Sequence, residues 1–179
     1  MTEQPTTTTT QKKFIRQRTL STEYNIYLDS EVKSSEEYTE LFDTLVNAGV
    51  NDEINIYINN DGGLIDTAIE IVNMIKDCNG EVTTILNGSG HSAASIIFMA
   101  GHKKIVKNHS YMLCHFYSAG LYGKGQELRE SSKFLDKHLK KWNSEIYKGF
   151  LTTAELEKMF NGQDFWFDST EIKKRLKIK

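Results

Sequence analysis

The chain has 179 residues, of which 39% are hydrophobic and 26% charged, and its formal net charge is −2. This length suffices for one domain that buries about two-thirds of its unfolded surface. The near-neutral charge argues against a nucleic-acid partner or a membrane surface, and the longest apolar run is too short to span a bilayer.

Cysteine usage and the N-terminus bear on the compartment. Cys78 and Cys114 form neither a disulfide framework nor a metal-ligand spacing, and the N-terminal residues contain no apolar signal core. We therefore expect a cytoplasmic protein with a flexible polar tail over residues 1–19 and a single domain over residues 20–179.

Strand-like and helix-like spacings of apolar residues alternate along the chain. The expected strands are 25–28, 54–58, 81–86, 104–106 and 111–115. The expected helices are 35–48 after a capping box at Ser34, 65–78, 92–100, 125–150, one from Thr152 to about Gly162, and one opening at Asp168. This alternation predicts βαβ crossovers and a largely parallel sheet covered by helices.

One short segment, Asn87-Gly88-Ser89-Gly90-His91-Ser92, lies between an apolar strand and an apolar helix. Its glycines favour a sharp turn, and Ser92 stands at the start of the helix. A serine there has its oxygen close to free backbone N–H groups and to the positive end of the helix dipole, which suits a nucleophile. It also suits an ordinary N-cap without any chemistry, which is the commoner role of a serine at this position.

Functional groups of α/β sheets gather where strands lead into helices. Here Gly62-Gly63 follow one strand, His115 ends another, and Asp164 lies in a polar loop before an aromatic run. Taken alone, His115 could be an interior histidine and Asp164 a turn residue. A nucleophile, a base, a carboxylate and a glycine turn are together the parts of an acyl-transfer site.

Four blocks in the same order and with nearly the same separations resemble the Clp protease proteolytic subunit family. They are the strand ending at Gly62-Gly63, the segment Gly88 to Gly101, Asn108 to His115, and Asp164 to Glu171. The resemblance implies a serine endopeptidase with Ser92 as nucleophile, His115 as general base and Asp164 as the residue that orients the histidine. The implied oxyanion hole is formed by the backbone N–H groups of Gly63 and Ala93.

The resemblance also implies a crotonase-like α/β fold in which ββα units form a superhelix, with the long helix over 125–150 protruding as a handle. It implies ring-shaped homo-oligomers, heptameric or stacked in double rings, an AAA+ unfoldase ATPase as partner, unfolded polypeptides as substrates, and no cofactor. Several positions depart from the family pattern: Asn60-Asp61, His91, Ala94 and Phe116-Tyr117 in the cleft, and Phe165 where the family has an arginine that helps join its rings.

Two other functions stay open. The departures around the cleft fit a non-catalytic ring subunit with a structural role. The fold would also suit a crotonase-type acyl-CoA enzyme, although a serine–histidine–aspartate set is not what stabilising an enolate requires.

Overall fold

The second strand of the main sheet alternates between buried and more exposed side chains. In a computed structural model that describes residues 21–120 and 122–178, the strand β2 (Glu53–Asn60) buries Ile54, Ile56 and Ile58. The intervening side chains lie on the opposite face, where Tyr57 stacks on Tyr27 of β1 (Glu23–Leu28) with ring centroids 4.9 Å apart. The period of two is that of a strand covered on one face. The expected polar tail over residues 1–19 lies outside the described residues.

The sheet is parallel except at one edge. Its order is β1-β2-β3-β5-β6, and β3 (Glu81–His91) is long enough to pair first with β4 (Lys103–Val106) and then with β5 (Tyr111–Cys114). All these pairs are parallel, whereas β6 (Phe165–Asp168) runs antiparallel to β5. The prediction of a mixed α/β fold with a largely parallel sheet is confirmed.

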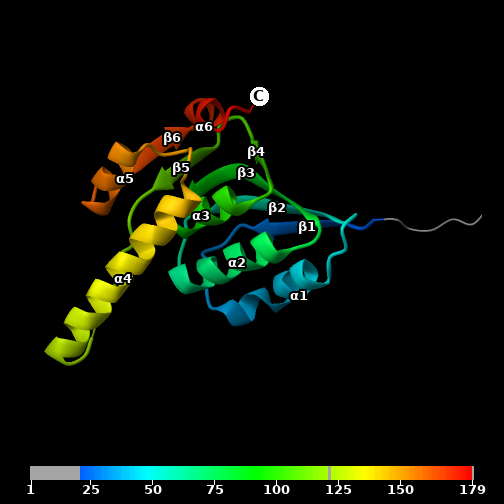
Figure 1. Cartoon of the computed structure of the whole chain (residues 1–179). Coiled ribbons are helices and arrows are strands. Elements are labelled where there is room, and N and C mark those ends of the chain that lie inside the picture. Colours follow the sequence, from blue (N-terminus) through cyan, green and yellow to red (C-terminus); the bar gives the residue numbers. More distant parts are fainter. Residues whose placement is uncertain (1–20, 121, 179) are drawn as a thin grey trace, which may run out of the picture.

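Helices cover the face of the sheet that carries the buried residues (Figure 1). They are the 3₁₀ turn η1 (Ser35–Tyr38), α1 (Thr39–Asn47), α2 (Ile65–Asp77) and α3 (Ala93–Ala100). Of these, α3 is the most buried, with seven of its eight residues buried. All but one of the buried hydrophobic residues form one contiguous cluster that reaches from Leu28 to Ile172.

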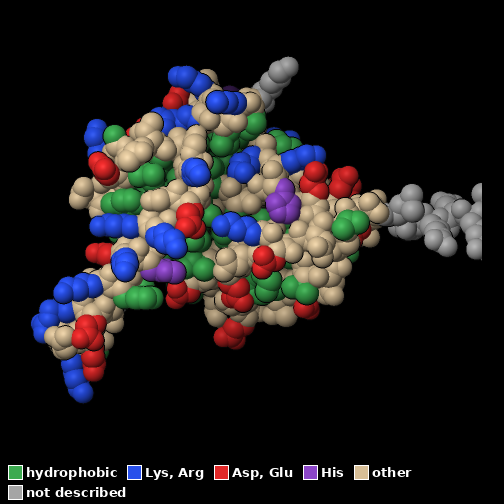
Figure 2. Space-filling view, in the orientation of Figure 1, with side chains coloured by type: hydrophobic (Ala, Val, Ile, Leu, Met, Phe, Trp, Pro, Cys, Tyr) green, Lys and Arg blue, Asp and Glu red, His purple; other side chains and the backbone are tan. Residues whose placement is uncertain are grey.

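The long helix α4 (Gly125–Ile146) projects from this core (Figure 1). Its buried residues all lie between Leu139 and Ile146, and its free end carries both acidic and basic side chains (Figure 2). The expectation that it continues to Phe150 is wrong, because the chain turns back at Tyr147 and Gly149 takes a φ of 82°. None of the described helices is long and apolar enough to cross a membrane.

Two further expectations for local structure need correction. The strand predicted to end at Leu86 continues as β3 through His91, so that the chain turns at Ser92 and not at the preceding glycines. The capping box predicted at Ser34 is absent, since this serine makes no capping hydrogen bond and the segment opens with a 3₁₀ turn.

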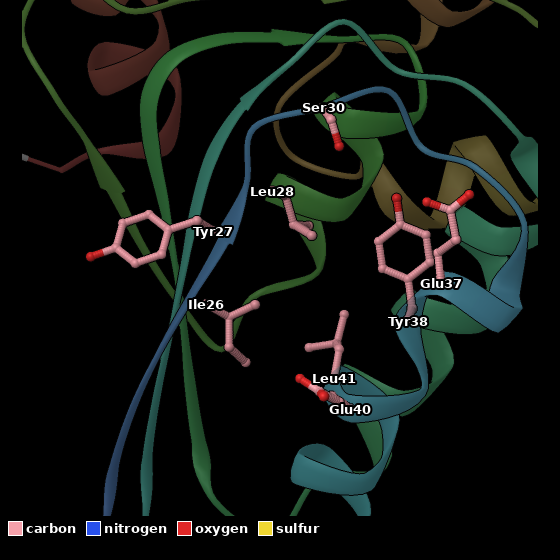
Figure 3. Close-up of a pocket in the computed structure, with 8 residues that line it drawn as sticks. All are labelled: Ile26, Tyr27, Leu28, Ser30, Glu37, Tyr38, Glu40 and Leu41. Carbon is pink, nitrogen blue, oxygen red and sulfur yellow. The ribbon is translucent and has the colours of Figure 1, made fainter.

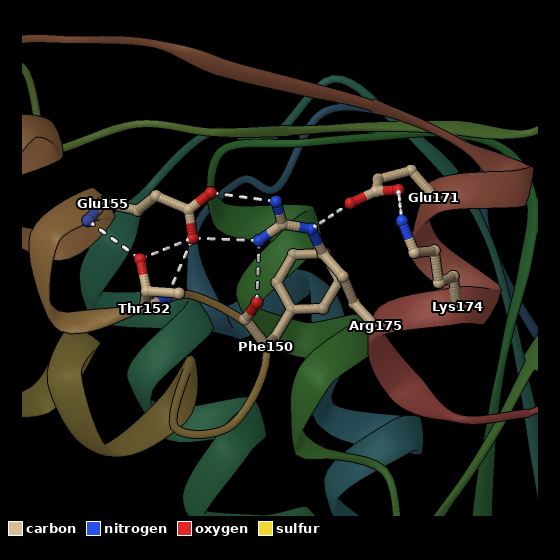
Figure 4. A network of polar contacts seen from close by, with 6 residues as sticks. All are labelled: Phe150, Thr152, Glu155, Glu171, Lys174 and Arg175. Atoms are coloured by element: carbon tan, nitrogen blue, oxygen red, sulfur yellow. Dashed lines mark hydrogen bonds and ion pairs between the residues drawn. The ribbon is translucent and has the colours of Figure 1, made fainter.

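The C-terminal elements are held together by one arginine. Arg175 of α6 (Ser169–Leu176) binds both carboxylate oxygens of Glu155 in α5 (Thr153–Phe160), each at 2.9 Å, and its Nε donates to Glu171 at 2.8 Å (Figure 4). It also donates to the Phe150 carbonyl at 3.0 Å, and its guanidinium lies 4.6 Å from the centre of the Phe167 ring. Bidentate pairing and stacking of this kind are specific to arginine.

We expect Arg175→Met to lower the free energy of unfolding by about 2 kcal/mol at pH 7, because it removes charge-assisted hydrogen bonds from a side chain that is 22% exposed. Arg175 lowers the pKa of Glu155 from 4.5 to about 2, chiefly through their hydrogen bonds. A lowered carboxylate pKa stabilises the fold above the unfolded value, and this contribution is lost as the pH falls from 4.5 towards 2. The difference between variant and wild type should therefore shrink on acidification.

Denaturant unfolding at pH 7, 4 and 3 measures this difference. The matched control is Lys174→Met, which removes only an exposed partner of Glu171 at 3.5 Å and should change stability very little. An Arg175→Met effect that stays constant with pH would contradict the assignment to the Glu155 carboxylate.

Candidate active site

The backbone of Ser92 is strained. Its φ of 52° and ψ of −123° put a non-glycine residue in a region that L-amino acids rarely adopt, at the junction of β3 and α3. Such conformations cost about 1–3 kcal/mol and gather at functional sites. Although Ser92 stands at the N-cap position, its side chain makes no capping hydrogen bond. The ordinary cap, one of the two interpretations that the sequence allowed, is therefore not what the structure contains.

Backbone hydrogen bonds hold this turn. The Ser92 N–H donates to the Leu113 carbonyl in β5 at 2.9 Å, and the Ser92 carbonyl accepts from the N–H groups of Ser95 at 3.0 Å and Ile96 at 3.3 Å. The turn is thus tied to the neighbouring strand on one side and to the first turn of α3 on the other. Among the described residues the hydroxyl makes no hydrogen bond, and Ser92 stands at a sharp strand-to-helix turn, the geometry of a nucleophile elbow.

Ser92 and His115 line one groove of about 250 Å³, together with Gly63, Leu64, Ile65, Tyr117 and Ser118. His115 follows directly on β5 and is half-buried. The Tyr117 hydroxyl donates to Asp136 of α4 at 2.8 Å, and burial raises the pKa of this tyrosine, with a further increase from Asp136. The groove therefore combines a serine, an imidazole and a glycine turn beside mostly apolar side chains.

Asp164 lies just before β6, is exposed and is not among the residues that line the groove. The antiparallel pairing of β5 with β6 runs from Tyr111 opposite Asp168 to Cys114 opposite Phe165. Continued by one residue, this register sets His115 opposite Asp164. Directly opposed residues of antiparallel strands have Cβ atoms about 5 Å apart.

Within residues 21–120 and 122–178, no hydrogen bond or ion pair joins any two of Ser92, His115 and Asp164. The structure thus brings Ser92 and His115 into one groove, whereas Asp164 lies one residue beyond the paired register and forms no hydrogen bond or ion pair with His115 among the described residues. Catalytic hydrogen bonds are often long before substrate binds.

The glycine turn after β2 packs directly against the Ser92 turn. A Cβ on Gly62 would lie 2.8 Å from the Ser92 Cβ, and one on Gly63 would lie 2.1 Å from the Val32 carbonyl oxygen. The Val32 N–H donates to the Gly62 carbonyl and the Val32 carbonyl accepts from the Leu64 N–H, both at 2.7 Å. The Gly63 N–H makes no hydrogen bond to any described residue. Ala93 is the first residue of α3, whose first N–H groups have no acceptor within the helix.

Asn60 fixes the glycine turn, a role that the sequence does not signal. It is only 3% exposed, its Oδ1 accepts from the Gly62 N–H at 2.8 Å, and its Nδ2 donates to the Ser30 carbonyl. An Asn next to Asp-Gly-Gly suggests only a polar turn, so the buried amide becomes apparent only from the fold.

His91 is one of the positions expected in the cleft, but the structure places it outside the groove. It packs between Tyr111 and Trp166, with ring centroids 5.2 Å away in both cases. Its Nδ1 lies 3.0 Å from Oδ1 of Asp61. The His91 imidazole is therefore paired with the Asp61 carboxylate and is not available to replace His115 beside Ser92.

A second pocket lies far from these residues along the chain. It has a volume of about 280 Å³ and is formed by β1, the residues that follow it, η1 and α1 (Figure 3). Its lining includes Tyr27, Glu37 and Tyr38, and none of the predicted site residues.

Comparison with known proteins connects this arrangement to one family. The chain is 25% identical over 123 residues to the ATP-dependent Clp protease proteolytic subunit of Bacteroides fragilis, and the match covers 68% of this chain and 59% of the relative. It is 30% identical over 123 residues to the ATP-dependent Clp protease proteolytic subunit 2 of Borreliella burgdorferi, with coverage of 68% and 62%. It is also 30% identical over 125 residues to proteolytic subunit 3 of Streptomyces avermitilis, with coverage of 68% and 56%.

The matched region thus spans somewhat less than two-thirds of the length of these relatives. The sequence profile described as Clp protease extends further and matches residues 7–175. By this match, the chain belongs to the Clp protease family.

Proposed function

We propose that this chain is the proteolytic subunit of a Clp-type serine endopeptidase and that Ser92 is its nucleophile. The observation that carries the proposal is the strained Ser92 turn, whose hydroxyl is not used for capping and which shares a groove with His115. Neither a packing residue nor a helix cap requires a serine at this φ and ψ.

In the proposed mechanism, His115 removes the proton from the Ser92 hydroxyl as its oxygen attacks a peptide carbonyl. The oxyanion accepts hydrogen bonds from the N–H groups of Gly63 and Ala93, and His115 returns its proton to the leaving amine. Water, deprotonated by His115, then hydrolyses the acyl-serine. Asp164 would hold the imidazole in the required tautomer, and each oxyanion donor is typically worth about 10²–10³ in rate.

Assembly and partners are part of the same proposal. Family membership supports a ring of identical subunits, with α4 as the handle between rings, and an AAA+ unfoldase that delivers extended polypeptides. The projection of α4 beyond the core suits that role, since a helix with few buried side chains in its outer half is available for contacts with another subunit.

The second candidate is a non-catalytic ring subunit. It is favoured by one observation, that Asp164 is exposed and forms no hydrogen bond or ion pair to His115 within the described residues. Without a carboxylate partner, the imidazole would be a poorly oriented base.

A fluorophosphonate probe separates the two candidates, because it reacts covalently only with an activated serine. We expect one adduct per wild-type chain by intact mass, no adduct on Ser92→Ala, and strongly slowed labelling of His115→Ala. The absence of an adduct on wild-type protein that is folded and oligomeric would favour the structural subunit. Labelling of Ser92→Ala at the wild-type rate would contradict the assignment of the nucleophile.

A further inference from the structure

A pair of buried hydroxyl groups lies behind the Ser92 turn. The Ser95 hydroxyl donates to the Ser92 carbonyl at 2.6 Å, and its oxygen lies 2.6 Å from the hydroxyl of Tyr147. Ser95 has one hydroxyl hydrogen, and the Ser92 carbonyl can only accept. Tyr147 must therefore donate to Ser95. The two hydrogen bonds form a chain, here called the relay, that leads from the Tyr147 hydroxyl through the Ser95 hydroxyl to the Ser92 carbonyl.

The relay connects two elements that are distant in sequence. Ser95 lies in the first turn of α3, whereas Tyr147 follows the last residue of α4, and the inner end of α4 packs against α3 (Figure 1). The Cys114 thiol contacts both hydroxyls, and it directly precedes His115. The buried cluster of Ser95, Tyr147 and Cys114 therefore includes the residue before the candidate base and contacts the carbonyl of the candidate nucleophile.

The polar cluster of Ser95, Tyr147 and Cys114 lies entirely within the core, where each of the three is fully buried. Burial raises the pKa of the Cys114 thiol to about 12 and that of Tyr147 well above its usual value, so both groups stay neutral and serve as fixed hydrogen-bonding groups. Burial of two hydroxyls costs free energy unless each is paired, and here both are, since Tyr147 donates to Ser95 and Ser95 donates to the Ser92 carbonyl.

Resting on the proposed function, we infer that Ser95 and Tyr147 are positioning residues that hold the strained Ser92 turn in its reactive conformation. The Ser92 carbonyl accepts three hydrogen bonds, and the Ser95 hydroxyl supplies the shortest of them. Because Tyr147 donates to the Ser95 oxygen, the Ser95 hydrogen is directed at the Ser92 carbonyl. The inner end of α4 therefore determines how firmly the Ser92 backbone is held. Any change at α4 that displaces Tyr147 would then reach the nucleophile without touching substrate.

The variants are Tyr147→Phe, Ser95→Ala and the double substitution, compared by fluorophosphonate labelling rate, by kcat and KM for a short peptide, and by thermal unfolding. We expect Tyr147→Phe to lower kcat and the labelling rate about three- to tenfold with KM unchanged, as the loss of one hydrogen bond predicts. Ser95→Ala should lose more, and the double variant should equal Ser95→Ala because the two hydroxyls act in series.

The matched control is Thr84→Val. Its hydroxyl is also fully buried and donates at 2.7 Å to the Phe98 carbonyl, at the opposite end of α3. This variant should lower the melting temperature without slowing the labelling of Ser92. If labelling simply follows melting temperature across all four variants, the relay only supports packing and the inference fails.

Amide hydrogen exchange tests the relay without any chemistry at Ser92. The N–H groups of Ser95 and Ile96 donate to the Ser92 carbonyl, so Tyr147→Phe should reduce their protection while leaving Phe98 unchanged. Unchanged protection at Ser95 and Ile96 would overturn the inference even if wild type proves unreactive. Failure of wild type to label, with reduced protection in Tyr147→Phe, would instead count against the proposed function alone.

Discussion

Replacing Ser92 by glycine is expected to abolish peptide cleavage and to yield a protein more stable than Ser92→Ala. Both variants lack the nucleophile, whose loss typically costs about 10⁴–10⁶ in kcat. They differ in the backbone, because alanine retains a Cβ at a φ of 52° and a ψ of −123°, whereas glycine adopts this region freely. We expect a difference of about 1 kcal/mol in the free energy of unfolding, measured by denaturant titration alongside a peptidase assay.

The matched control for this prediction is His109→Gly, at another non-glycine residue with positive φ (66°), in the turn between β4 and β5. It should be neutral or slightly stabilising and leave cleavage intact, since His109 does not line the groove. Two results would count against the assignment of Ser92: residual cleavage by Ser92→Gly near the wild-type rate, or a Ser92→Gly protein less stable than Ser92→Ala.

Substitution of Gly63 by alanine should be the most destabilising single change at the site. Its Cβ would lie 2.1 Å from the Val32 carbonyl oxygen and 2.8 Å from the Val32 nitrogen, and the φ of 143° already disfavours any side chain. The clash is with backbone that cannot move away, because hydrogen bonds on either side join Val32 to Gly62 and Leu64. We expect a loss of more than about 4 kcal/mol, as for the rare severe substitutions, with cleavage lost as well.

Gly162→Ala is the control that distinguishes a steric clash of the new Cβ from the cost of a positive φ. Gly162 also has a positive φ, of 93°, but a Cβ there would meet no atom within 4 Å. It should therefore cost only about 1–2 kcal/mol, the penalty for a left-handed residue. Similar melting temperatures for the two alanine variants would mean that the close approach of Gly63 to Val32 is not important for stability.

The elements that could be predicted from the sequence are those whose residue pattern reflects burial or capping within the element itself. The alternation of Ile54, Ile56 and Ile58 and the amphipathic spacing of α2 reflect one-sided burial, and both elements form as expected. The capping box of Thr152 with Glu155 also forms, with hydrogen bonds in both directions. In contrast, β6 is not evident from Phe165-Trp166-Phe167, because its strand conformation depends on pairing with β5, some 50 residues earlier in the chain.

In the candidate site, too, the local sequence predicts some features, whereas others depend on contacts between distant parts of the chain. Ser92 and His115 could be anticipated, since each lies where an expected strand gives way to the following segment, and the groove does bring them together. The conformation of Ser92 could not be anticipated, because no residue preference predicts a serine at positive φ after a glycine-rich strand. The contributions of Asn60 and Tyr147 depend on contacts across 30 and 52 residues of chain, respectively, which leave no mark on local sequence.

The short strand β5 has a consequence for how the family can vary. Its Leu113 carbonyl accepts from the Ser92 N–H, its last residue leads into His115, and its register with β6, continued by one residue, places Asp164 opposite His115. Inserting or deleting one residue within Tyr111–Cys114 would turn His115 to the opposite face of the sheet. Length changes in the connection to α4, after the groove residues, would leave all three alignments intact. Evolutionary insertions and loop grafts should therefore be tolerated between Ala119 and Lys124 and rejected in the four residues of β5.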